Sequence, residues 1–441
     1  MTQVWNRSPL SSTVDSQDDL DDWQIADAVH ARLIRDLDDS ILRGVDSARI
    51  REQVEAGARV IATHLYPSLA GDRKEDVVTV VVDEVLGLGP IEPLLRDPHV
   101  SEVMINGARE VFYERDGLLH EATARFRDDA HVFKVIDRIV SAIGRHVDEA
   151  SPMVDARLAD GSRVNVVIPP LVPAGPVVTI RRFLGDRYTM DDLVSIATLT
   201  AEMAQLLEAC VKARLSIVVS GGTGSGKTTF LNSLSAFIPS RERIVTIEDP
   251  IELKLQQRHV ISMEARPPST EGRGEVTQRA LLRNSLRMRP DRIIVGEVRG
   301  GESFDMLQAM NTGHDGSLTT VHANSPRDAL SRIENMVLTA GFDLPVAAIR
   351  DQMASAFNVI VQLSRLADGS RKVVSVTEVT GTEGNVVTMQ DLFQFKQTGI
   401  DAEGRVVGRQ RATGLRPTFS DRLKAYGLDV SSDLFDVGRW S

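Results

Sequence analysis

Residues 221–228 read Gly-Gly-Thr-Gly-Ser-Gly-Lys-Thr, which matches the phosphate-binding pattern Gly-x-x-x-x-Gly-Lys-Ser/Thr. Glycines let the backbone wrap closely and turn its N–H groups inward, and the N-terminus of a following helix adds positive potential. We expect Lys227 to reach the β- and γ-phosphates of a nucleotide and the Thr228 hydroxyl to bind Mg²⁺. The phosphate-binding residues predicted here are Gly222, Thr223, Gly224, Ser225, Gly226, Lys227, Thr228 and Thr229.

Acidic residues follow two apolar segments, 244–247 and 292–295. In open α/β sheets the carboxyl ends of strands face the ligand crevice, where acids hold Mg²⁺ through water or orient the attacking water. Glu248 and Asp249 are therefore candidates for Mg²⁺ binding. Glu297 is the candidate for water activation, because Gly296 stands where such strands usually end in Asp. The residues leave open whether Glu248 or Glu297 is the general base.

One histidine and two arginines complete the candidate site. His322 ends the apolar segment 318–321, so it is expected on the phosphate side, where it either hydrogen-bonds the γ-phosphate or packs structurally. A zinc pair with His314 is disfavoured, because no Cys or nearby third ligand accompanies them. Arg163 and Arg181 lie in strand hairpins that would hold them rigidly, and phosphoryl transfer needs such positive charge at the γ-phosphate.

The 441-residue chain carries 51 basic and 62 acidic side chains, a formal charge of −11. This balance argues against direct binding of nucleic acid, and 5% aromatic residues are few for base stacking. A single cysteine, Cys210, excludes an intramolecular disulfide and a multi-Cys zinc site. No apolar run approaches the length of a membrane helix, and the first residues lack a signal pattern, so we expect a cytoplasmic protein.

The elements that must position these residues fall into several predicted regions. A polar tail, 1–19, precedes a helical bundle, 20–95, in which Ala26, Val29, Leu33, Leu37 and Ile41 recur at helical spacing, and helices are expected over 49–65 and 75–86. A mixed α/β domain, 96–185, and a linker, 186–197, come next. The region 198–441 alternates strands and helices as a parallel sheet does, and it ends in antiparallel hairpins.

The expected strands can be placed by residue number. Between 96 and 185 they are 103–105, 110–113, 163–168 and 176–182, with a helix over 130–143. In the last region they are 215–220, 244–248, 292–297, 317–322, 359–363, 372–380 and 386–395. The segment 216–220 is apolar and 229–234 has a helical pattern, so the glycine-rich loop stands in the strand–loop–helix context that phosphate binding needs. That context disfavours a turn without a ligand.

Together these segments resemble the secretion ATPase superfamily of type II and type IV secretion and of type IV pili. The motifs are GGTGSGKTT, TIEDPIE, RMRPDRIIVGEVRGGESFDMLQAMNTGHDGS and LTTVHANSPRDAL. More narrowly, the chain is similar to the CpaF-type ATPases of tight-adherence (Flp) pilus assembly, from about residue 75 to the C-terminus. The resemblance implies a RecA-like P-loop core with a smaller, PAS-like α/β domain before it, ATP bound between the two domains, and a homo-hexameric ring.

The resemblance also implies roles for particular residues. Glu297 would be the catalytic glutamate, and Arg163 and Arg181 would match arginines that reach the nucleotide phosphates. The ring would act on inner-membrane platform proteins, which would hold it at the membrane as a peripheral protein, and so drive pilin into or out of a filament. The tetra-Cys zinc module of type II secretion ATPases is absent from the sequence.

Four functions remain after this step. The first is a motor that hydrolyses ATP, and the second is a nucleotide-dependent switch or scaffold with little turnover. A small-molecule kinase is disfavoured, because no segment suggests an acceptor pocket with a lid. Within the motor class, a VirB11-type ATPase for conjugation, DNA uptake or protein secretion shares the same core motifs, so the partner distinguishes it.

Overall fold

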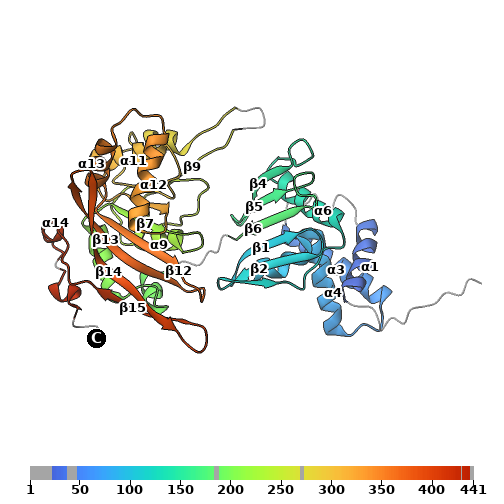
Figure 1. The fold of residues 1–441 in the computed structure, drawn as a ribbon. Coiled ribbons are helices and arrows are strands. Elements are labelled where there is room, and N and C mark those ends of the chain that lie inside the picture. The colour runs from blue at the N-terminus through green and yellow to red at the C-terminus, as the bar shows by residue number, and fades with distance from the viewer. Residues whose placement is uncertain (1–21, 37–46, 183–187, 269–272, 429, 438–441) are drawn as a thin grey trace, which may run out of the picture. The chain divides into compact units, whose positions relative to one another are not determined.

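A computed structural model describes residues 22–36, 47–182, 188–268, 273–428 and 430–437. Their contacts divide the chain into two units, residues 1–184 and 185–441 (Figure 1). The predicted flexible tail, 1–19, lies outside the described residues, as do the helix positions predicted at Leu37 and Ile41. None of the described helices has the length and apolar character needed to cross a membrane.

The first unit begins with three helices that pack on one another: α1 (Asp22–Asp36), α3 (Ser47–Leu65) and α4 (Gly71–Leu86). Apolar side chains at three-to-four spacing form their shared core, among them Val29, Val54 and Val81, each with no exposed surface. Gly57 on α3 permits the close approach of α1, since a Cβ there would lie 2.9 Å from Leu33 Cδ1. The helices predicted over 49–65 and 75–86 are confirmed, and α4 begins four residues earlier than predicted.

An antiparallel sheet of six strands follows the helices, after the short turns η1 (Gly89–Ile91) and α5 (Glu92–Arg96). Its order is β3-β2-β1-β6-β5-β4, and α6 (Asp129–Ser141) packs its apolar stripe against it. The strands are β1 (Val100–Asn106), β2 (Glu110–Arg115), β3 (Leu118–Glu121), β4 (Met153–Arg157), β5 (Arg163–Val167) and β6 (Val177–Arg181). All four strands predicted in this region are present, whereas β3 and β4 were not predicted.

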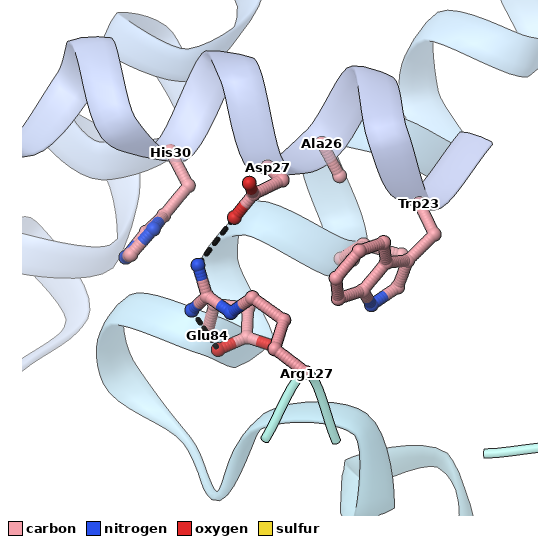
Figure 2. A pocket seen from close by; sticks show the side chains of 7 residues that line it. Trp23, Ala26, Asp27, His30, Glu84 and Arg127 are labelled. Carbon is pink, nitrogen blue, oxygen red and sulfur yellow. Dashed lines mark hydrogen bonds and ion pairs between the residues drawn. The ribbon is translucent and has the colours of Figure 1, made fainter. Parts of the chain in front are cut away.

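A charged cluster fastens α1 to the rest of the first unit (Figure 2). Arg127, in the loop before α6, forms an ion pair with Asp27 of α1 and lies 3.9 Å from Glu84 Oε2 of α4. Glu84 also contacts His131, whose Nε2 is 2.9 Å from Glu84 Oε2. Burial lowers the pKa of the neighbouring His30, and the carboxylates of Glu84 and Asp27 only partly oppose this. The cluster therefore joins three elements that are distant in sequence.

The second unit contains a nine-stranded sheet of order β15-β14-β13-β12-β7-β11-β10-β8-β9 (Figure 1). The strands from β12 to β9 run parallel, and β13, β14 and β15 extend the sheet as antiparallel hairpins. Their bounds are β7 (Ile217–Gly221), β8 (Ile244–Glu248), β9 (Val260–Glu264), β10 (Arg292–Val295), β11 (Leu318–His322), β12 (Val359–Arg365), β13 (Arg371–Glu383), β14 (Val386–Ile400) and β15 (Val406–Ala412).

Helices cover both faces of the parallel strands, as the buried apolar runs in those strands require. On one face lie α7 (Met190–Ser195), α8 (Ala201–Lys212) and α9 (Lys227–Ser235). The other face carries α10 (Gln278–Ser285), α11 (Glu302–Asn311), α12 (Pro326–Thr339) and α13 (Val346–Ala356). The chain ends with α14 (Ser420–Ala425) and η2 (Ser432–Phe435). The predicted α/β class and the seven strands predicted here are confirmed; β9 and β15 were not predicted.

Candidate functional site

The glycine-rich loop connects the end of β7 to the start of α9, as predicted. Gly224 and Gly226 have φ values of +69° and +90°, in the left-handed region that favours glycine. At Gly221 a Cβ would lie only 2.7 Å from the carbonyl oxygen of Leu363, so the loop leaves the sheet in close contact with the neighbouring strand. The Ser225 hydroxyl donates to the Gly222 carbonyl over 2.8 Å and closes the loop on itself. Such a loop presents backbone N–H groups toward an anion.

Lys227 is the first residue of α9, and its side chain folds back into the loop. Its Nζ donates to the Gly222 carbonyl oxygen over 2.9 Å and lies 3.1 Å from Nε2 of His322. His322 ends β11, which pairs with β7 so that His322 is opposite Gly221. The parallel pairing therefore brings the two predicted residues together at the carboxyl edge of the sheet.

His322 lies in a row between Lys227 and Glu297. Burial lowers the pKa of His322, and the Lys227 ammonium lowers it further, while Glu297 opposes the shift. A neutral imidazole offers its Nε2 lone pair to the ammonium of Lys227, which a protonated imidazole would repel. Oε1 of Glu297 is 3.4 Å from the same nitrogen. The row thus places a carboxylate next to the loop.

Glu297 comes two residues after β10 and is held by Arg299. The Arg299 guanidinium donates from Nε over 2.9 Å and from Nη2 over 2.5 Å to Oε2 of Glu297. Glu302, at the start of α11, fixes this turn: its Oε1 accepts from the backbone N–H groups of Arg299 and Gly300 over 2.6 and 2.8 Å. The carboxylate of Glu297 therefore has a defined position at the strand ends.

Glu248 ends β8 and is only 2% exposed. Its Oε2 accepts from the backbone N–H groups of Glu252 and Leu253 over 2.8 and 2.9 Å, so it organises the segment that follows. Burial raises the pKa of Glu248, and those two backbone hydrogen bonds oppose the shift. A Cβ at residue 296 would lie 2.7 Å from Glu248 Cγ, which explains why glycine stands there.

Glu252, rather than Glu248, makes a hydrogen bond with the predicted Mg²⁺ ligand. The hydroxyl of Thr228 donates to Oε2 of Glu252 over 3.2 Å. Asp249 is exposed and begins a cis peptide bond to Pro250. The Gln278 amide joins this segment to the turn after β10: when oriented to satisfy both partners, it accepts from Asp249 N over 3.2 Å and donates to Glu297 O over 3.1 Å.

The donor set fits Mg²⁺ that is bound mainly by substrate and water. Thr228 and Glu252 offer hard oxygen atoms 3.2 Å apart, and Mg²⁺ typically takes one or two protein oxygens besides phosphate and water. Within the described residues, no group of three or more His, Cys, Asp or Glu side chains is placed to hold a metal ion by itself. The predicted ligation by Glu248 and Asp249 stays a prediction.

Two arginines beside the loop were not among the predicted residues. Arg371, which begins β13, donates from Nε to the Gly224 carbonyl oxygen over 2.9 Å. Arg365 is its cross-strand partner on β12, and its Nη1 lies 3.3 Å from where a Cβ on Gly224 would be. The Asp368-Gly369 turn predicted the hairpin, but no local pattern indicates a contact that spans 147 residues.

Arg163 and Arg181 lie in the first unit, on β5 and β6, where they are direct cross-strand partners. Arg181 is 49% exposed, with its Nε 3.6 Å from Oε1 of Glu102. The adjacent Arg182 is a structural residue, because its guanidinium donates to the Val100 carbonyl over 2.9 Å. The structure thus groups the two predicted arginines in one unit and the loop, Glu248, Glu297 and His322 in the other.

Residues 84–419, which contain every element of this site, match the family model described as type II/IV secretion system protein. The chain belongs to this family of secretion ATPases. It is 36% identical over 313 residues to a putative conjugal transfer protein of Mycobacterium tuberculosis, which covers 70% of this chain and 88% of the relative. It is 32% identical over 316 residues to the type IV secretion system protein VirB11 of Brucella suis, over 65% of this chain and 88% of the relative.

The fold of this secretion ATPase is also that of a solved motor protein. The crystal structure of the pilus retraction motor PilT with bound ADP aligns with a TM-score of 0.50 at 20% identity, over 77% of this chain and 86% of that one. At that identity the likeness concerns the fold alone. It confirms the predicted RecA-like α/β class.

Proposed function

We propose that this secretion ATPase binds ATP with Mg²⁺ at residues 221–228 and hydrolyses it. The observation that carries the proposal is the row Lys227–His322–Glu297, with neighbouring atoms 3.1 and 3.4 Å apart beside the glycine-rich loop. A cation for phosphate oxygens and a carboxylate for water activation stand together at one sheet edge. Phosphoryl transfer to water requires this combination.

Each residue has a defined part in this reaction. Lys227 exchanges its contact with Gly222 for the phosphate oxygens, and the backbone N–H groups of the loop bind the remaining charge. Glu297 accepts the proton of the attacking water. Glu248 is a positioning residue, because its Oε2 is occupied by two backbone N–H groups. When bound, Mg²⁺ neutralises phosphate charge next to Thr228 and Glu252.

We further propose that Arg163 and Arg181 supply positive charge to the γ-phosphate in the transition state. Two guanidinium groups opposite each other on one sheet repel unless an anion lies between them. The cross-strand pairing of these two arginines supports the proposal, because it gathers two cations on the α/β sheet. Arg181→Ala is then expected to lower kcat more than it weakens nucleotide binding.

The proposed assembly is a homo-hexameric ring that couples hydrolysis to membrane components of a secretion or pilus machine. The ring would lie on the cytoplasmic side of the inner membrane, held there by its partners. We favour assembly of a tight-adherence pilus through inner-membrane platform proteins, on the motifs of residues 221–229, 246–252 and 287–330. Conjugal transfer or type IV secretion is the second candidate, because the relatives of highest similarity reported above carry those descriptions.

ATP turnover and particle mass, measured on the same purified sample with Mg²⁺, test the proposal. We expect turnover in a species of about six times 48.3 kDa, and a loss of at least about 100-fold in Lys227→Ala. Lys212→Ala is the matched control, because that exposed lysine pairs only with Glu208 on its own helix. Nucleotide binding without turnover in any species would favour the switch or scaffold, and turnover by a monomer would remove the ring.

A further inference from the structure

Strand β15 forms one edge of the nine-stranded sheet and pairs only with β14. The Thr413 N–H donates to the Leu392 carbonyl over 3.0 Å, in register with the Arg411–Gln394 and Arg409–Lys396 pairs. Because antiparallel ladders alternate, the backbone groups of Arg409 and Arg411 bond to β14 and those of Gly408 and Gln410 point outward. No backbone hydrogen bond to the N–H or C=O of these two residues is found in the described part of the chain.

One face of this edge is basic. Lys396, Arg409 and Arg411 are exposed and project from the same face, together with the 45% exposed Val407. Lys396 stands directly opposite Arg409, an arrangement of like charges that costs stability unless an anion lies nearby. By contrast, Arg405 is paired with Asp401 and Glu403. Among the described residues no hydrogen bond or ion pair is found for the side chains of Lys396, Arg409 or Arg411.

From this juxtaposition we propose that β15 is a docking edge for an extended acidic segment of a partner protein, which adds as a further strand beside Gly408 and Gln410. Main-chain hydrogen bonds to the outward groups would supply affinity for any extended chain. Alternate acidic side chains of the segment would lie on the face of Arg409 and Arg411 and supply specificity. This surface is separate from the nucleotide site, so the proposal does not depend on ATP hydrolysis.

Two other readings of the basic edge give different results in the same test. Charged side chains on an edge strand also prevent unwanted pairing, in which case no acidic segment binds. An anionic membrane would attract the same cations, although the chain as a whole carries a charge of −11 and would be repelled. The alternation of acids along the added strand is what distinguishes a docked strand from simple charge attraction.

The test uses the full chain and two fluorescent decapeptides of identical composition. One alternates Asp and Thr, and the other has five Asp followed by five Thr. Fluorescence anisotropy is expected to show the alternating peptide binding about tenfold more tightly than the block peptide, since only it can place every acid on one face of a strand. Cosedimentation with phosphatidylglycerol vesicles is measured in parallel.

Charge reversal locates the site. Arg409→Glu with Arg411→Glu is expected to weaken binding of the alternating peptide by at least about tenfold. The control is Arg241→Glu with Arg258→Glu, two exposed arginines elsewhere in the second unit, which should change it less than about twofold. If the reversed protein melts below the control, Arg409→Gln with Arg411→Gln replaces it. Equal binding of both peptides, no binding, or vesicle binding that depends on Arg409 and Arg411 would each overturn the proposal.

Discussion

The ammonium of Lys227 lies 3.1 Å from Nε2 of His322, although 95 residues separate the two in sequence. Their contact follows from the parallel pairing of β7 with β11, which sets the end of one strand beside the loop that leaves the other. Because a protonated imidazole would repel the ammonium, the contact requires a neutral His322. The phosphate-binding lysine and the protonation state of this histidine are therefore linked.

Turnover should consequently depend on the protonation of His322. Burial and Lys227 hold the pKa of His322 below its ordinary value of 6.5, so the imidazole is neutral at pH 7 and gains its proton only as the pH falls below 6.5. The wild-type rate is then expected to fall over that acidic range, and His322→Gln should show a shallower fall. His120→Gln, an exposed histidine in the first unit, should keep the wild-type profile. Identical acidic limbs in His322→Gln and wild type would contradict the link.

Glu248 should matter for its hydrogen bonds more than for its charge. Glu248→Gln keeps an oxygen that can accept from Glu252 N and Leu253 N, and it removes a buried charge, so stability should change by less than about 1 kcal/mol. Glu248→Ala leaves both N–H groups without an acceptor and should cost about 2–3 kcal/mol. Denaturant unfolding of both variants measures this. Equal losses in the two variants would mean that the charge itself is needed.

Gly296 should not tolerate a side chain. A Cβ there would stand 2.7 Å from Glu248 Cγ and 3.3 Å from its Oε2, so Gly296→Ala must displace a buried, hydrogen-bonded carboxylate. We expect a loss of about 1–3 kcal/mol in the free energy of unfolding. Gly399→Ala is a suitable control, because nothing lies within 4 Å of a Cβ at that position. A melting temperature of Gly296→Ala equal to that of this control would show that Glu248 moves freely.

Sequence patterns predicted the elements whose residues carry a strong local signal. The apolar segments before Gly221 and Gly296 are fully buried central strands, and the loop between β7 and α9 has a distinct glycine spacing. Edge strands were missed, because β3 is exposed throughout and β15 alternates half-buried and exposed residues with little apolar content. Their pairing depends on neighbours in the sheet rather than on their own sequence.

Side-chain partners across the fold were harder to predict than elements. The sequence indicated acids near the loop but not that Glu252 would contact Thr228, since Glu248 comes directly at the strand end and Glu252 four residues later. The structure explains this: the carboxylate of Glu248 turns inward to bind the backbone of the segment that carries Glu252. The contact of Arg371 with Gly224 likewise depends on where β13 lies in the sheet.

The central claim is that Glu297 activates water for ATP hydrolysis, and one comparison tests it most directly. ATP binding and steady-state turnover are measured with Mg²⁺ for wild type, Glu297→Gln and the exposed control Glu383→Gln. Because the amide keeps the shape of the carboxylate without its basicity, Glu297→Gln should bind ATP within about threefold of wild type and turn over at least about 100-fold more slowly. Undiminished turnover in Glu297→Gln, beside an unchanged control, would contradict the account.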